Sequence, residues 1–225
     1  MRLSGSIGLA LALLAVAGWE GNVEDGNDAP TVEPTHPAAP PQLSPAEQAR
    51  QAELQQMRMQ ARREVQDLRF LVDISDRQLR ISKGDEVVAT HDVAVGTSDW
   101  PTPTGEWKIH RVDINPEWVP PKEEEWAEDE ETKAPGDPEN PMGKARLVYR
   151  MPNTIHGTDD LASLGKASSH GSIRVANEVV VQLAQMLLKA GGAWDGPQWF
   201  QHMLETETEE YQVKLQQPVP ITVQE

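Results

Sequence analysis

From Leu68 onward, hydrophobic and polar residues alternate in a series of short runs, and this period of two limits the possible folds more than any other feature. The runs cover residues 69–75, 77–84, 86–96, 102–114, 145–150, 211–215 and 218–224. Alternation of this kind is typical of β-strands with one buried face. Gly84 and Asp85 supply a turn between the second and third runs. The sequence therefore predicts a mainly β domain over residues 68–225.

Helical patterns interrupt the strands once and also precede them. Residues 176–192 carry apolar side chains at helical spacing up to Gly191, and residues 196–206 fit a second, shorter helix. Upstream, Ser44 has the chemistry of an N-cap and is followed by a proline and, three residues on, a glutamate. Strong helix formers with few apolar residues come next. We therefore expect residues 45–67 to form an exposed helical stalk.

The N-terminal 44 residues have the pattern of an export signal and a spacer. Arg2 precedes a mostly apolar run that ends in small residues by Gly18, as in secretory signal peptides. The run is shorter than the roughly 20 residues that span a bilayer. We expect residues 1–18 to direct export, with an uncleaved membrane tether as the alternative. Residues 19–44 are rich in proline, glycine and acid and predict a disordered linker.

Composition excludes several classes of function. The chain has no cysteine, which rules out disulfides, thiolate metal sites and a thiol nucleophile. Its net charge of −16 and pI of about 4.7 argue against nucleic-acid binding, because that affinity depends on Lys and Arg. Residues 117–139 contain ten acidic and two basic residues and indicate a solvated segment. No histidine has metal-ligand spacing, so we predict no metal and no cofactor.

Two histidine-centred segments carry the functional signal. His156 lies in the segment TIHGT at residues 154–158, and Ser172 in the segment SSHGSIRV at residues 168–175. Together they resemble the L,D-transpeptidase catalytic domain, or YkuD domain, of bacterial cell-wall enzymes. That family has a His-Gly segment and, roughly fifteen residues later, Ser/Thr-His-Gly-Cys-hydrophobic-Arg/Asn. Further segments, at residues 93–109, 115–121 and 135–143, resemble other landmarks of the family, so the likeness covers about residues 70–225.

The resemblance implies a β-sandwich or barrel with one or two helices, and an acyl transferase that acts on peptidoglycan stem peptides in crosslinking, cell-wall attachment or remodelling. It also implies a location in the periplasm or cell envelope of a bacterium. Family members attack the third residue of a tetrapeptide stem with a cysteine and expel the terminal D-Ala. Here Ser172 occupies the position of that cysteine. His156 maps to the general base, and His170 maps to the site-lining histidine.

The resemblance assigns four further residues to oxyanion or substrate binding: Gly157, Ser169, Gly171 and Arg174. The backbone N–H groups of Gly171 and Ser172 map to the oxyanion hole. Arg174 maps to a position that holds the site or a substrate carboxylate. Acyl transfer needs this combination of a nucleophile, a base and donors aimed at the developing oxyanion.

Ser172 leaves the activity open. It is either a natural serine nucleophile, a mark of an inactive domain that still binds peptidoglycan, or an engineered change or sequence error. A serine normally requires a histidine supported by a third group, and Asp159 or Asp160 could complete such a triad. A secreted β-rich adhesion protein with coincidental motifs is disfavoured, because the histidine, glycine and arginine residues of both segments are all present.

The acidic insertion at about residues 115–141 corresponds to a segment that often forms a lid over the substrate channel in the family. We expect it to be a mobile flap selective for cationic acceptors, such as the free amine of a stem peptide. Trp100, Trp107, Trp118 and Trp126 are expected to fill the core or the insertion. Sugar stacking by Trp118 or Trp126 is the alternative.

Overall fold

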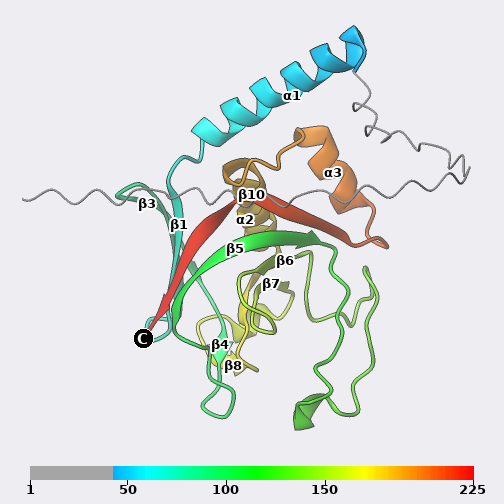
Figure 1. The fold of residues 1–225 in the computed structure, drawn as a ribbon. Coiled ribbons are helices and arrows are strands. Elements are labelled where there is room, and N and C mark those ends of the chain that lie inside the picture. The colour runs from blue at the N-terminus through cyan, green and yellow to red at the C-terminus, as the bar shows by residue number, and fades with distance from the viewer. Residues whose placement is uncertain (1–42) are drawn as a thin grey trace, which may run out of the picture. The chain divides into compact units, whose positions relative to one another are not determined.

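The computed structural model describes residues 43–225, so the predicted signal peptide and all but the end of the predicted linker lie outside the described residues. The elements are α1 (Pro45–Arg63), β1 (Leu68–Asp73), β2 (Gln78–Lys83), β3 (Glu86–Asp92), β4 (Val95–Gly96), β5 (Gly105–Ile114), the short 3₁₀ helix η1 (Glu125–Ala127), β6 (Ala145–Val148), β7 (Ile155–Thr158), the 3₁₀ helix η2 (Leu161–Ser163), β8 (Ala167–Ser169), β9 (Ile173–Ala176), α2 (Asn177–Ala190), α3 (Pro197–Glu205) and β10 (Tyr211–Gln224). Figure 1 shows their arrangement.

Eight strands form one mixed sheet in the order β3-β2-β1-β10-β5-β6-β7-β9. The pairs β1–β10 and β7–β9 are parallel, and the other neighbours are antiparallel. The predicted alternation holds in β1 and β2, where Phe70, Val72, Leu79 and Ile81 are buried. Such alternation places every second side chain in the core. The expected mainly β class is therefore confirmed.

The two edges of this sheet come close enough to join. Just beyond edge strand β3, Ala94 forms two backbone hydrogen bonds, of 3.0 and 2.9 Å, with Arg174 of the opposite edge strand β9. Immediately afterwards, β4 pairs with β8 in a separate two-stranded sheet. The sheet thus nearly closes on itself, in agreement with the predicted sandwich or barrel.

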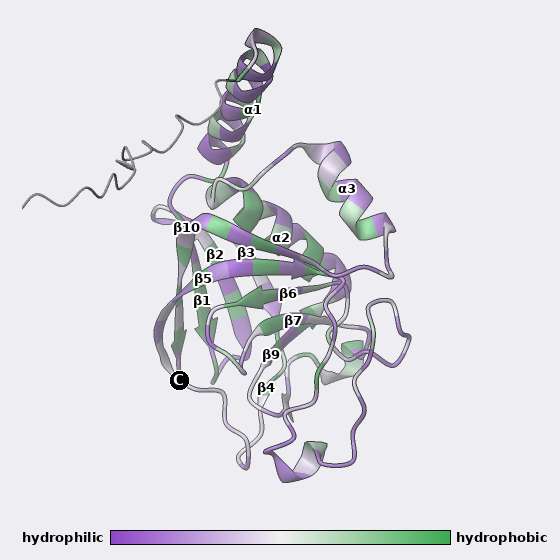
Figure 2. Cartoon of the chain, turned by 45° about the vertical axis from the view of Figure 1, so that its right-hand side comes forward, coloured by the Kyte–Doolittle hydropathy of each residue, from purple (hydrophilic) through white to green (hydrophobic). Residues whose placement is uncertain are grey.

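Helix α2 covers one side of this curved sheet and supplies much of the core. Its Val180, Leu183, Leu187 and Leu188 are buried, and it packs against β6, β7 and β10. Figure 2 shows the hydrophobic residues of α2 and of the strands beside it. Burying a leucine side chain stabilises the fold by about 1.5–3 kcal/mol. The helix therefore packs against β7, the strand that carries His156, and holds it in place.

The N-terminal helix α1 begins as predicted but ends earlier. Ser44 and Glu47 form the full capping box. The helix stops at Arg63, whereas the expected stalk extended to residue 67. Most of it is exposed, but Ala61 is buried and Leu54 and Arg58 are half-buried. Arg58 binds Asp195 at 2.5 Å. No helix among residues 43–225 is long and apolar enough to cross a membrane.

The strands nearest the histidine motifs were not predicted. β7, β8 and β9 contain four residues or fewer, too few for alternation to be recognised. All four residues of β7 are buried, so this strand has no solvent-exposed face. The predicted run 86–96 is divided between β3 and β4. Conversely, the two C-terminal runs form the single strand β10, with a bulge between Lys214 and Val219.

Candidate active site

The parallel pairing of β7 and β9 brings His156 and Ser172 to the same place. Their register aligns Ile155 with Ile173 and His156 with Arg174. One step earlier, the Thr154 N–H donates to Ser172 Oγ at 3.2 Å, and the Ile173 N–H donates to the Thr154 carbonyl at 2.9 Å. Alternate residues of a strand share a face, so the His156 and Ser172 side chains lie on one face of the pair.

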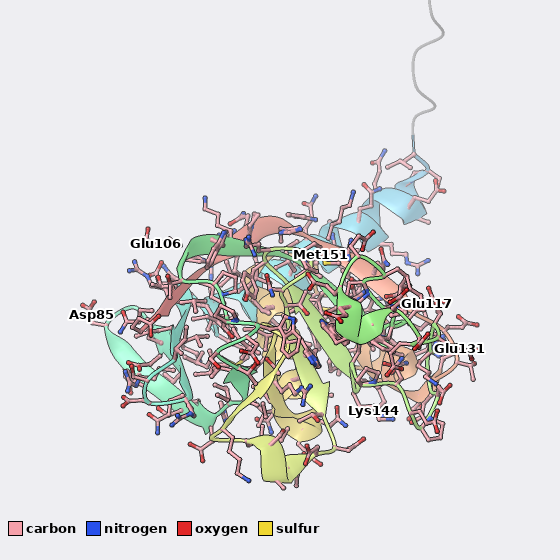
Figure 3. The ribbon with its side chains drawn as sticks, turned by 90° about the horizontal axis from the view of Figure 1, so that it is seen from below. Asp85, Glu106, Glu117, Glu131, Lys144 and Met151 are labelled. Atoms are coloured by element: carbon pink, nitrogen blue, oxygen red, sulfur yellow. The ribbon has the colours of Figure 1, made fainter. Side chains whose placement is uncertain are left out.

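That face forms part of the wall of a cavity of about 960 Å³. The predicted site residues on its lining are His156, Ser169, His170, Ser172 and Arg174. The acidic insertion covers part of the same cavity. In Figure 3, Met151 lies near the ribbon of the insertion, and Glu117 and Glu131 lie toward its outer side. Both the sheet and the insertion therefore contribute to the wall of the cavity.

His156 is buried and held in one orientation. Its Nδ1 lies 2.9 Å from the carbonyl oxygen of Gly157. A carbonyl can only accept, so Nδ1 carries the proton and Nε2 presents a lone pair. Burial, with smaller contributions from Arg174 and Arg146, lowers the pKa of His156 to about 4. The imidazole is therefore neutral near pH 7 and can accept a proton at Nε2.

No Ser–His–Asp triad forms among residues 43–225. The Nδ1 position, where a supporting carboxylate would bind, is occupied by the Gly157 carbonyl. Asp159 instead accepts a hydrogen bond of 2.7 Å from Asn177, and Asp160 is exposed. The orientation of His156 depends on a backbone carbonyl, which lacks the full negative charge of an aspartate.

Ser169 shapes the turn that carries Ser172. Its hydroxyl donates to the Ser172 carbonyl at 2.5 Å and accepts from the Gly171 N–H at 3.2 Å. Gly171 has a φ of +94°, a backbone conformation that favours glycine. The Gly171 N–H is therefore already bonded in this geometry, so its predicted role as an oxyanion donor would require it to give up the hydrogen bond to Ser169. The Ser172 N–H has no protein acceptor within residues 43–225.

Gly157 also has a different role from the one expected. A Cβ at this position would lie 2.2 Å from Asn177 Oδ1 and 2.9 Å from Val180 Cγ1. Gly157 thus faces α2 rather than the cavity, and its small size allows the helix to approach the strand. Its carbonyl contributes to the site by orienting His156.

Two tryptophans hold His170 at the cavity wall. Trp126 stacks on the imidazole with ring centroids 3.9 Å apart and planes 6° apart. Trp100 meets the same ring edge-on at 4.7 Å. Both tryptophans line the cavity. Filling the core or the insertion, as expected from the sequence, is therefore not their only role. Trp118 is buried within the insertion, while Trp107 packs against Tyr149.

The cavity has charges of both signs. Acidic residues Asp99, Glu124, Glu130 and Glu139 contribute to its lining, as do the basic residues Lys133, Arg146, Arg150 and Arg174. Some are already paired, as in the 3.0 Å contact of Lys133 with Glu139. Arg174 has no side-chain partner within the described part of the chain, and burial lowers its pKa. Within those residues no group of three or more candidate ligands could hold a metal ion.

Sequence reasoning missed three features of the site. Arg146 of β6 lies opposite His156 of β7 in the antiparallel register, but strand β7 was not predicted from the sequence. Asn153 and Arg150 reach the cavity from the loop before β7. Trp126, an aromatic residue within an otherwise acidic segment, was the one sequence signal for these features. Its stacking on His170 could be recognised only from the folded structure.

Comparison with known proteins agrees with the motifs. The sequence matches the family described as YkuD, L,D-transpeptidase catalytic domain, over residues 67–214. It is 32% identical over 120 residues to a candidate L,D-transpeptidase, YkuD, of Bacillus licheniformis, covering 53% of this chain and 59% of that protein. It is 30% identical over 160 residues to a probable L,D-transpeptidase, YbiS, of Escherichia coli K12, covering 63% and 52% respectively. The chain thus spans between half and two-thirds of these relatives.

Solved structures of L,D-transpeptidases also match this chain, with TM-scores below 0.5. One is an L,D-transpeptidase from Mycobacterium smegmatis, with 16% identity, a TM-score of 0.44, and coverage of 71% of this chain and 59% of that one. Another, from Mycobacterium tuberculosis, has 14% identity and a TM-score of 0.40 over 71% and 58%. The family match, by contrast, covers about two-thirds of the sequence. The chain therefore belongs to the YkuD family of L,D-transpeptidase catalytic domains.

Proposed function

We propose that this domain is an acyl transferase for peptidoglycan stem peptides and forms an acyl-enzyme on Ser172. One observation carries the proposal. Ser172 Oγ accepts the Thr154 N–H, which leaves its own hydroxyl proton free to be donated to a base. His156, on the same face of the strand pair, presents Nε2 as a neutral acceptor. The two residues have the roles that acyl transfer needs.

The reaction proceeds in two balanced steps. Ser172 Oγ attacks the carbonyl of the third stem residue, while His156 Nε2 takes the hydroxyl proton. The tetrahedral intermediate collapses, and the D-Ala amine leaves with the proton from His156. An acceptor amine then attacks the ester, loses a proton to His156, and releases Ser172, which regains its proton. With water as acceptor, the same steps give a carboxypeptidase.

The charges of the cavity support a zwitterionic peptide substrate. Arg174 has no side-chain partner within residues 43–225 and lies beside His156 in register, so it suits a substrate carboxylate. Glu124 and Glu130 reach the cavity from the insertion and suit an amine. Export through residues 1–18 to the periplasm or cell envelope, with or without a membrane tether, belongs to the same proposal, because peptidoglycan lies outside the cytoplasm.

A second candidate, binding of stem peptides without turnover, is favoured by the basicity of His156. Burial lowers its pKa to about 4, and a weaker base removes a hydroxyl proton less effectively. A thiol, with an ordinary pKa near 8.5, ionises far more readily than a serine hydroxyl. The cavity could therefore retain its ligand after the chemistry was lost.

The deciding experiment compares the wild type with Ser172→Cys and Ser172→Ala. Each purified protein is incubated with a disaccharide-tetrapeptide, and mass spectrometry measures D-Ala release and an adduct at residue 172. An adduct on Ser172 that is absent from Ser172→Ala supports the acyl transferase. If the wild type behaves like Ser172→Ala while Ser172→Cys reacts, the binding candidate holds. Equal D-Ala release by all three proteins would mean that the nucleophile is wrongly assigned.

A further inference from the structure

The side-chain amide of Asn153 lies against the turn that carries Ser172. Asn153 is half-buried and lines the cavity. A Cβ built on Gly171 would lie 2.7 Å from Asn153 Nδ2, so the amide nitrogen is next to the Gly171 backbone. Thr154, the next residue, donates its N–H to Ser172 Oγ. The loop before β7 therefore contacts this turn at two consecutive residues.

The orientation of this amide is determined by its neighbour. Arg150 donates to Asn153 Oδ1 at 2.6 Å. A guanidinium has only donors, so the amide oxygen must face Arg150 and Nδ2 must face the other way, toward Gly171. Arg150 is itself placed 6.0 Å over the ring of Trp107 on β5. A charged donor on the amide oxygen also makes the Nδ2 hydrogens stronger donors.

This turn has fewer free backbone donors than acyl transfer requires. The Gly171 N–H is bonded to Ser169 Oγ at 3.2 Å, whereas the Ser172 N–H has no protein acceptor within residues 43–225. The same is true of Asn153 Nδ2, for which no acceptor exists in the described residues. An oxyanion hole normally combines two or more donors. The Asn153 amide is an unused side-chain donor that lies directly beside this turn.

We propose that Asn153 Nδ2, together with the Ser172 N–H, stabilises the oxyanion that develops on the acyl carbonyl during attack by residue 172. The inference rests on the proposed function and adds a catalytic side chain from outside both histidine motifs. It assigns Arg150 as a positioning residue, which acts only through the orientation of the amide.

The test separates transition-state stabilisation from binding. Asn153→Asp keeps the shape but replaces the donor with an acceptor, and Asn153→Ala removes both. Each is made in the wild type and in Ser172→Cys, and acylation by the disaccharide-tetrapeptide is followed by intact-protein mass spectrometry. Binding of the same ligand is measured by calorimetry in Ser172→Ala with and without Asn153→Ala. Gln198→Glu, at an exposed position on α3, is the control for converting an amide to an acid.

We expect both Asn153 variants to slow acylation about 100- to 1,000-fold, with the Kd of the ligand changed less than about threefold. Arg150→Met should give a smaller loss in rate, and Gln198→Glu none. Rates within about threefold of the parent protein, or a loss that appears equally in Kd, would overturn the assignment. If Ser172 is not acylated but Ser172→Cys is, the serine proposal fails and Asn153 is judged in the cysteine background. If neither is acylated, both proposals fail.

Discussion

Trp126 stacks flat on His170, with ring centroids 3.9 Å apart and planes 6° apart. The contact joins η1, in the acidic insertion, to the turn that carries Ser172. Near its base, paired backbone hydrogen bonds of 2.9 Å between Trp118 and Lys133 join the two arms of the insertion to each other. Arg146 of β6 donates to the Glu117 carbonyl at 3.3 Å, so the insertion contacts the body of the domain at its base and the site through Trp126.

Removing Trp126 should raise the pKa of His170. Burial is the main cause that lowers it, with Arg174 adding to the effect and Glu124 opposing it. Without the indole, water reaches the imidazole and the charged form becomes less costly. In Trp126→Ala we expect the His170 pKa, measured by NMR titration, to move up toward its ordinary value. Trp126→Phe keeps a stacking ring and should retain most of the lowering. An unchanged pKa in Trp126→Ala would show that the indole does not shield His170.

Loss of the Asp113 carboxylate should strongly destabilise the fold. Asp113 is fully buried and binds Arg111 at 2.7 Å and Arg146 at 2.8 Å, and Arg146 lies beside His156 in register. Removing one partner from a buried ion pair costs about 3–5 kcal/mol, since the remaining charges stay buried. Urea unfolding of Asp113→Ala should show a loss of that size. Asp76→Ala, which breaks a pair at an exposed aspartate, should cost under about 1 kcal/mol. Similar losses in the two variants would contradict this explanation.

The buried His156 should make stability depend on pH. Its pKa falls from an ordinary 6.5 to about 4 in the fold. Between these values the unfolded chain binds a proton that the folded chain does not. The stabilisation that the neutral His156 gives to the folded state is therefore complete above about pH 6.5. It is lost as the pH falls toward 4, and the free energy of unfolding decreases by about 3 kcal/mol in all. His156→Gln lacks this proton, so the stability difference between the two proteins should change over that range. A constant difference would show that the histidine is not protected from protonation.

Elements that depend on repeated local patterns could be predicted from the sequence. β1 and β2 were visible because Phe70, Val72, Leu79 and Ile81 alternate with polar residues, and α1 because Ser44 begins a capping box. Pairing distant strands requires long-range contacts that no local pattern specifies. The bridge between Ala94 and Arg174, which nearly closes the sheet, belongs to this second group.

The residues of the candidate site were recognised by motif, whereas several of their roles were not. Motif position suggests that Gly157 and Gly171 both approach substrate. In the fold, Gly157 faces α2, and the Gly171 N–H binds Ser169. For Gly157 the reason is that strand geometry sends neighbouring residues to opposite faces. Gly171 instead lies in the turn between β8 and β9, where Ser169 Oγ accepts its N–H. Asn153 carries no motif, so its placement beside Gly171 depends on how the loop before β7 folds back on the turn.

Two glutamates of the acidic insertion should account for the proposed preference for amines. Glu124 and Glu130 line the cavity, whereas Glu123 and Glu131 are exposed and do not. We expect Glu124→Gln/Glu130→Gln to weaken binding of a stem peptide with a free amine about 3- to 10-fold, each screened charge contributing under about 1 kcal/mol.

The matched pair Glu123→Gln/Glu131→Gln removes the same net charge from outside the cavity. It should change binding little at physiological salt, because these exposed carboxylates do not line the cavity and salt screens charges in solvent. Calorimetry is carried out in Ser172→Ala so that no acylation interferes. A peptide whose amine is acetylated should bind the wild type and both double variants equally. If the two double variants weaken binding of the amine peptide to the same extent, net charge accounts for the effect. A local amine site at Glu124 and Glu130 would then be excluded, because of the four substituted glutamates only these two line the cavity.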